Sequence, residues 1–205
     1  FYDKLIETVV ESYAGYVEVH ADGFWDNQSL DNSMEVDQSL INNIKTVEGV
    51  DNIVQRLQTF TLISMGNKTK GGVINGISIS DEQKITDWSK KMVSGTFEIN
   101  ENEIIVGKGI AEYFNIKEND TLILYGQGYR GMMAAGKYPV AGVIDLKNPD
   151  LNKLGIFMTI ESARSYVSSD DISTHIIIDK ERYYDEIKIV NDLSQTLSDD
   201  YEIMT

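Results

Sequence analysis

The chain has 205 residues, of which 41% are hydrophobic and 25% are charged, a composition typical of a folded protein with a substantial core. Its 33 acidic and 18 basic side chains give a net charge of −15, which disfavours binding to nucleic-acid backbones and to anionic lipid head groups. Cysteine is absent, which excludes disulfides, thiol nucleophiles and cysteine-bound metals in this sequence, and there are only two histidines.

The first third of the chain predicts two amphipathic helices, each followed by a strand. Apolar residues spaced by three and four indicate a helix over 1–14, and alternating residues indicate a strand over 16–20. The segment 21–35 is rich in Asp, Asn, Ser and Gly, a composition typical of a loop. A second amphipathic pattern covers 36–48, and the β-branched and aromatic residues of 50–65 predict a long strand.

The next segment predicts a turn, a strand and then a clearly bounded helix. Residues 67–72 (NKTKGG) have the composition of a turn. Ser80 and Gln83 have the spacing of a capping box, which predicts a helix over 80–95 with Trp88 on its buried face.

The remainder predicts mainly short strands, with brief helices between them and one long helix near the end. Runs of β-branched residues alternate there with turn-forming Gly, Asn and Asp. The expected strands cover 103–107, 121–125, 138–145, 156–159, 172–179 and 201–204, and the expected helices cover 110–114, 160–167 and 180–197.

These elements predict an α+β fold built from two parts. Strand–helix–strand units over 16–65 and 172–205 fit a split βαβ arrangement, in which both units share one sheet with their helices on one face. The β-rich block between them is then an inserted, smaller subdomain. We therefore expect a discontinuous split βαβ subdomain over 1–68 and 169–205, and the inserted subdomain over 69–168.

Gly126, Gly128 and Gly131 match the spacing of a dinucleotide-binding motif directly after an expected strand. That motif opens a helix of about three turns, whereas only four residues separate Gly131 from the next glycine. The segment 126–137 is better explained as the loop of an antiparallel hairpin. An enzyme that binds a nucleotide here would instead require a helix over 131–142.

The hairpin loop carries large, adaptable side chains of kinds that are enriched at protein interfaces. Two interpretations remain open: a partner-binding loop, or a loop whose methionines fold back onto the subdomain. The candidate partner-binding residues are Tyr129, Arg130, Met132 and Met133.

Two aromatic residues, Phe24 and Trp25, lie in the otherwise polar loop near the start. They either pin this loop to the core or face a partner. His20 and His175 fall on expected strands and are interpreted as structural, because the sequence places no carboxylate partners for a metal beside them. No catalytic, cofactor-binding or metal-binding residues are predicted, and the chain is not expected to be an enzyme.

Five segments together carry a family resemblance: YVEVHADGFWDNQSLDNSM (16–34), the stretch from GGVINGISIS to MVSGTF (71–97), EIIVGKGIAEYFNIKENDTLILY (103–125), KYPVAGVID (137–145) and GIFMTIESARSYV (155–167). Their order and spacing resemble the periplasmic core domain of MacB-type and FtsX-like ABC transporter permeases, most closely the lipoprotein-releasing (Lol) permeases. One departure is Asn119-Asp120, where the family usually has Gly-Asp. Asn is tolerated in such a turn because it also accepts a positive φ.

The resemblance implies a discontinuous porter-like split βαβ subdomain with a smaller inserted subdomain. It implies a periplasmic, extracytoplasmic location at the inner membrane, with both chain ends continuing into membrane helices. The domain would be non-catalytic, would need no cofactor, and would transmit the motion of a cytoplasmic ABC ATPase while facing a second permease copy, identical or different. In lipoprotein-releasing permeases a hairpin loop, the hook, captures the carrier chaperone of the lipoprotein, and 126–137 takes its position here.

Other functions remain open. The alternative within the same group is a macrolide- or peptide-exporting permease, whose equivalent domain docks a periplasmic adaptor protein. A ligand-binding sensor would instead require a closed apolar pocket between the subdomains. The long Gly- and Met-rich loop favours the lipoprotein-releasing interpretation.

Overall fold

A computed structural model describes residues 17–205 of the chain, except 86, 118 and 147, so the helix predicted over 1–14 lies outside the described residues. None of the helices in the described part is long and apolar enough to cross a membrane. The strands are β1 (Val17–Ala21), β2 (Met34–Glu35), β3 (Val50–Met65), β4 (Lys68–Ile77), β5 (Met92–Gly95), β6 (Ile104–Gly107), β7 (Thr121–Gln127), β8 (Met133–Ile144), β9 (Gly155–Thr159), β10 (Ile172–Ser173), β11 (His175–Lys180) and β12 (Tyr201–Met204). The helices are α2 (Gln38–Lys45), α3 (Ile79–Ile85), α4 (Lys108–Phe114), α5 (Pro149–Leu154), α6 (Ile160–Val167) and α7 (Glu186–Thr196), with short 3-10 helices η2 (Leu30–Asn32), η3 (Ser89–Lys91) and η4 (Tyr129–Gly131).

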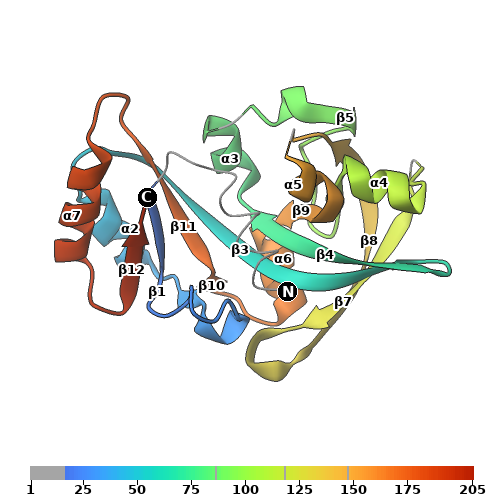
Figure 1. Ribbon diagram of the computed structural model, residues 1–205, viewed down its shortest axis with the longest axis horizontal. Coiled ribbons are helices and arrows are strands. Elements are labelled where there is room, and N and C mark those ends of the chain that lie inside the picture. The colour runs from blue at the N-terminus through green and yellow to red at the C-terminus, as the bar shows by residue number, and fades with distance from the viewer. Residues whose placement is uncertain (1–16, 86, 118, 147) are drawn as a thin grey trace.

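One end of the molecule is an antiparallel sheet in the order β12–β1–β11–β3, packed against α2 and α7 (Figure 1). The units β1–α2–β3 and β11–α7–β12 interlock, because one strand of each lies between the two strands of the other. Val19, Ile44, Ile176 and Leu193 are fully buried in the core that the sheet shares with these helices. This is the split βαβ arrangement that the sequence predicts, and the α+β fold class is confirmed.

The other end is a sheet that closes on itself. The second half of β3 leaves the split βαβ unit and pairs with both β4 and β7 (Figure 1). From β4 the sheet continues through β9, β6 and β8 to β7, which completes a closed ring of strands. Ile63, Ile74, Leu122 and Ile156 are fully buried in the main core of this part. β3 therefore joins the two parts as one continuous strand, and the subdomain boundaries at 68/69 and 168/169 stay a prediction.

The helix predicted over 80–95 is wrong in its second half. α3 covers only the first turns of this stretch, and residues 92–95 form β5 beside β8. Trp88 is buried as predicted, but between aromatic rings rather than on a helix face. It stacks on Phe97 at 5.2 Å and meets Phe157 edge-on at 5.3 Å between ring centroids. This aromatic packing outweighs the local helix signal.

Two other boundaries differ from prediction because of local turn chemistry. The turn predicted over 67–72 is the two-residue turn Gly66-Asn67, which closes the β3–β4 hairpin with Gly66 at a φ of 60°. α7 begins several residues later than predicted. The side chain of Asp185 accepts a hydrogen bond from the Ile187 amide and caps the helix there.

Candidate functional site

The predicted hairpin loop is a short tip at the end of two long paired strands. β7 and β8 pair as far as Gln127 and Met133, which leaves the five residues 128–132 between them. We call these residues, together with Met133 at the start of β8, the β7–β8 tip. The loop predicted over 126–137 is therefore too long, and its second half belongs to β8.

The glycines that match the dinucleotide-binding spacing lie in this hairpin, and β8 occupies the place where a nucleotide-binding helix over 131–142 would be. At Gly126, a larger side chain would clash with its neighbours. A Cβ at Gly126 would lie 2.9 Å from both the Phe60 carbonyl oxygen and the Tyr166 hydroxyl. Glycine at this position thus permits β7 to lie close to β3 and α6. The pairing of β7 with β8 confirms the hairpin interpretation.

Two of the four predicted partner-binding residues hold the tip against the rest of the molecule. Tyr129 is half-buried and packs on the main core, and the Arg130 guanidinium lies over its ring at 4.9 Å. The Arg130 amide donates a 2.8 Å hydrogen bond to an Asp31 carboxylate oxygen, and its guanidinium lies 3.9 Å from Glu35. The tip is therefore fastened to the segment that contains η2 and β2.

The other two predicted residues form the exposed face of the tip. Met132 and Met133 are 57% and 84% exposed. Exposed methionines offer a flexible, polarizable surface that adapts to apolar partners. The structure thus separates the predicted set into two anchoring residues and two residues free to touch a partner, and their role in binding stays a prediction.

The aromatic pair near the start packs against two histidines. Phe24 is 2% exposed, stacks on His20 at 5.6 Å and meets His175 edge-on at 5.5 Å between ring centroids. Trp25 is half-buried and meets His20 edge-on at 5.1 Å. Phe24 therefore lies inside the molecule, as the loop-pinning interpretation expects, and only Trp25 keeps a partly exposed surface.

The two histidines lie beside a carboxylate that sequence reasoning missed. His20 Nε2 is 3.1 Å from a Glu18 carboxylate oxygen, and one ligand atom each of Glu18, His20 and His175 lie within 4.8 Å of one another. We call these three residues the histidine group. Burial lowers the pKa of His175 well below 6.5, and the neighbouring His20 and Arg56 act in the same direction. The missed signal was the spacing of two between Glu18 and His20, which puts both on one face of a strand.

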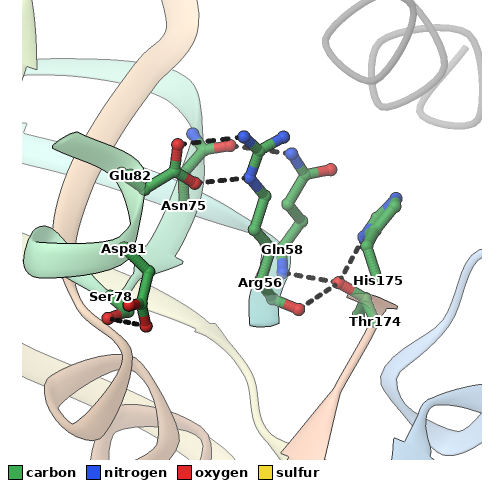
Figure 2. Close-up of polar contacts among 8 residues, drawn as sticks. All are labelled: Arg56, Gln58, Asn75, Ser78, Asp81, Glu82, Thr174 and His175. Atoms are coloured by element: carbon green, nitrogen blue, oxygen red, sulfur yellow. Dashed lines mark hydrogen bonds and ion pairs between the residues drawn. The ribbon is translucent and has the colours of Figure 1, made fainter. Parts of the chain in front are cut away.

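A buried polar network joins the two parts of the molecule (Figure 2). Arg56 on β3 donates two hydrogen bonds, of 2.6 and 3.0 Å, to the two carboxylate oxygens of Glu82 on α3. The side-chain amide of Gln58 donates to Asn75 on β4 at 2.9 Å, and the backbone amide of Gln58 donates to the Thr174 hydroxyl at 2.9 Å. We call these five residues the polar joint, because they connect β3 with α3, with β4 and with the start of β11.

A hollow of about 410 Å³ lies between α2, β3 and α3, and it differs from the closed apolar pocket that a ligand sensor requires. Charged side chains such as Lys45, Asp51 and Lys84 line it, and it is open to solvent. Such a lining does not favour an apolar ligand.

No protein-family model matches the chain, and no curated protein matches it in sequence. Solved structures nevertheless share its fold. The extracellular domain of the noncanonic ABC-type transporter YknZ from Gram-positive bacteria is 15% identical, over 93% of this chain and 100% of that one, with a TM-score of 0.62. The periplasmic region of MacB from Actinobacillus actinomycetemcomitans is 13% identical, over 98% of this chain and 93% of that one, with a TM-score of 0.63. A permease-protein domain from Porphyromonas gingivalis is 10% identical, over 92% and 85% of the two chains, with a TM-score of 0.52.

The chain therefore has the fold of the extracytoplasmic domains of MacB-type permeases, as the sequence resemblance predicts. The similarity extends over nearly the whole chain, so both the split βαβ unit and the closed ring belong to it. Closeness to the lipoprotein-releasing permeases in particular stays a prediction.

Proposed function

We propose that this chain is the non-catalytic extracytoplasmic domain of an ABC transporter permease, moved by a cytoplasmic ABC ATPase and facing a second permease copy. The observation that carries the proposal is the fold, which is similar over at least 92% of the chain to three such permease domains. The domain works mechanically, so it needs no catalytic residues or bound nucleotide of its own.

The path between the two ends of the molecule supports a role in transmitting motion. Glu18 on β1 pairs with Met204 on β12, so the start and the end of the described chain lie side by side. β3 runs from this sheet into the closed ring, and the polar joint ties it to α3 and β4. Displacement of the split βαβ unit is thereby passed to the ring and to its β7–β8 tip.

The β7–β8 tip supports the partner-binding part of the proposal. Its backbone is fastened through Arg130 to Asp31, while Met132 and Met133 are exposed. An anchored loop with exposed methionines binds with less loss of conformational freedom than a mobile loop. We propose that these methionines contact a carrier chaperone of lipoproteins.

A pull-down with the purified carrier chaperone of the source organism tests this partner. Replacing both Met132 and Met133 by serine removes the exposed apolar surface of the tip, and we expect binding to weaken at least about tenfold. The matched control is the double substitution of Tyr183 and Ile187 by serine, which removes exposed apolar side chains near the start of α7. That control binds like the wild type if the tip carries the contact.

Three results would change the assignment. Equal binding by the methionine variant and the wild type overturns the role of the tip. Absence of carrier binding by the folded wild-type chain overturns the lipoprotein-carrier partner. Capture of a periplasmic adaptor protein instead supports the exporter function.

The exporter function is the second candidate, and the length of the tip favours it. The tip has five residues between paired strands, whereas the sequence predicted a loop long enough to serve as a capturing hook. A short tip suits docking against the broad surface of an adaptor protein. The fold similarity to the periplasmic region of MacB fits either candidate.

A further inference from the structure

We propose that Glu18, His20 and His175 bind one divalent transition-metal ion of the zinc class. Glu18 and His20 lie two residues apart on β1 and therefore point to the same face, and His175 begins the neighbouring strand β11. One ligand atom of each lies within 4.8 Å of the other two. Imidazole nitrogens and a carboxylate oxygen are ligands that zinc takes in proteins.

Hydrogen bonds fix how His20 presents its ring. Nδ1 lies 3.1 Å from the carbonyl oxygen of Thr174, which only accepts hydrogen bonds, so the proton of the neutral ring is on Nδ1. Nε2 then carries a lone pair, yet it faces a Glu18 carboxylate oxygen at 3.1 Å, which is also an acceptor. A metal ion bound by both atoms satisfies them. A second proton on Nε2, which makes an imidazolium paired with Glu18, does so as well, and the nitrogen-15 spectra described below distinguish the two. Ligand histidines in metal sites typically donate their other N–H to a backbone carbonyl or a carboxylate in this way.

The surroundings of His175 also favour a proton on Nδ1 and a lone pair on Nε2. The Thr174 hydroxyl lies 3.2 Å from the Arg56 carbonyl oxygen and 2.7 Å from His175 Nδ1. With its one proton directed to the carbonyl oxygen, the hydroxyl accepts a hydrogen bond from His175 Nδ1. The lone pair of His175 is then on Nε2, which is buried and has no hydrogen-bond partner among the described residues. A buried acceptor without a partner is unfavourable, and coordination of a metal ion removes that penalty.

The ligand atoms of the histidine group are close to, but not yet at, the separations that a bound zinc ion requires. Ligand atoms of a tetrahedral zinc site with bonds of about 2.0–2.1 Å lie roughly 3.4 Å apart. His20 Nε2 and the Glu18 oxygen, at 3.1 Å, are already near this separation. The widest separation in the group, at most 4.8 Å, reaches this value if the His175 ring moves by at most about 1.4 Å toward the ion.

Aromatic side chains surround the group and shield it from solvent. Phe24 packs against both imidazoles, and Trp25 meets the edge of His20. An apolar shell of this kind holds ligand rings in place and limits the access of water to the metal. In this interpretation, Phe24 and Trp25 hold the imidazole rings in place and shield the metal from water.

The metal would fasten the two chain segments of the split βαβ unit to each other. Glu18 and His20 come from its first segment and His175 from its second, and Thr174 connects the site to the polar joint. An ion that binds the folded chain alone stabilises it in proportion to its affinity and concentration. This inference does not depend on the proposed function.

Titration of the metal-free chain with Zn²⁺ and Co²⁺ tests the site. We expect one ion per chain, a rise in the unfolding temperature, and the visible absorption bands of four-coordinate cobalt with Co²⁺. Glu18→Gln and His175→Gln remove one ligand each, and we expect zinc affinity to fall at least about tenfold in each variant. Glu98→Gln, an equal change in charge at an exposed position, leaves zinc affinity unchanged.

If the His175→Gln variant does not fold, nitrogen-15 NMR spectra of the imidazoles in the wild-type chain provide an independent test of the site. The chain has only two histidines, so both rings are resolved, and zinc is expected to shift Nε2 of each while Nδ1 stays protonated. The proposal is overturned if folded wild-type chain binds no zinc at a large excess of the metal. Equal zinc affinity of wild type and Glu18→Gln, or a His20 imidazolium that zinc does not change, overturns it as well.

Discussion

Tyr138 and Tyr166 show, at the scale of single residues, how the closed ring changes side-chain chemistry. They are 6% and 5% exposed, and their rings meet edge-on at 6.2 Å between centroids. Burial raises the pKa of both hydroxyls, because the phenolate loses the water that would solvate its charge. The hydrogen bond between the Tyr166 and Thr61 hydroxyls, at 3.0 Å, offsets part of this effect for Tyr166.

These two tyrosines predict a loss of stability at alkaline pH. The unfolded chain releases their protons near pH 10 while the folded chain retains them, so the free energy of unfolding falls as pH rises above about 10. The slope is up to about 1.4 kcal/mol per pH unit for each buried tyrosine. Urea unfolding at several pH values between 9 and 11 measures this slope, and the absorbance of phenolate reports when the tyrosines lose their protons.

Phenylalanine variants identify the residues responsible. Tyr138→Phe and Tyr166→Phe should each flatten the alkaline decline, whereas Tyr183→Phe, at a position 91% exposed, should not. An alkaline decline that is as steep in the double variant as in the wild type contradicts the assignment.

At the scale of elements, the ion pair between Arg56 and Glu82 fastens α3 to β3. The two side chains are 4% and 0% exposed, and the bidentate geometry satisfies both carboxylate oxygens. A pair buried to this degree contributes little net stability compared with apolar residues, but removal of one partner leaves an uncompensated charge.

Replacing Glu82 by glutamine should therefore lower the free energy of unfolding by about 3–5 kcal/mol, measured by urea denaturation. The double variant Arg56→Met with Glu82→Leu removes both charges and should be more stable than Glu82→Gln. The control Asp87→Asn breaks the exposed pair with Lys90 and should leave the unfolding midpoint unchanged. If the Glu82→Gln variant has the same urea midpoint of unfolding as the wild type, the ion pair does not hold α3 in place.

Elements with strong periodicity were predictable from the sequence. The strand over 50–65 and the helix over 160–167 have the predicted bounds, because their apolar patterns agree with the packing that they enter. The loss of the second half of the helix predicted over 80–95 was not predictable, because Trp88 packs against Phe157, which is distant in the sequence, as well as against Phe97. The start of β8 was missed because its small residues are typical of a loop, although a Cβ at one of them, Gly136, would lie 2.6 Å from the Tyr138 ring.

At the scale of the whole molecule, the interlocked units of the split βαβ sheet followed from the order of elements alone. The closure of the ring did not, because the pairing of β3 with β7 joins segments whose contact no local pattern records. The same limit applies to the candidate sites. The tip residues were predictable by type, whereas the histidine group and the polar joint depend on strands that only the fold brings together.

Extracytoplasmic location is the central claim about the whole molecule, and the lack of cysteine in these residues permits a direct test. Tyr183, 91% exposed, is replaced by cysteine in the full-length protein, with any other cysteine changed to serine, and intact spheroplasts are treated with a membrane-impermeant maleimide. Ile176→Cys, at a fully buried position, is the unlabelled control. We predict that Tyr183→Cys is labelled as completely in intact spheroplasts as after lysis. Labelling only after lysis would place the domain in the cytoplasm and contradict the account.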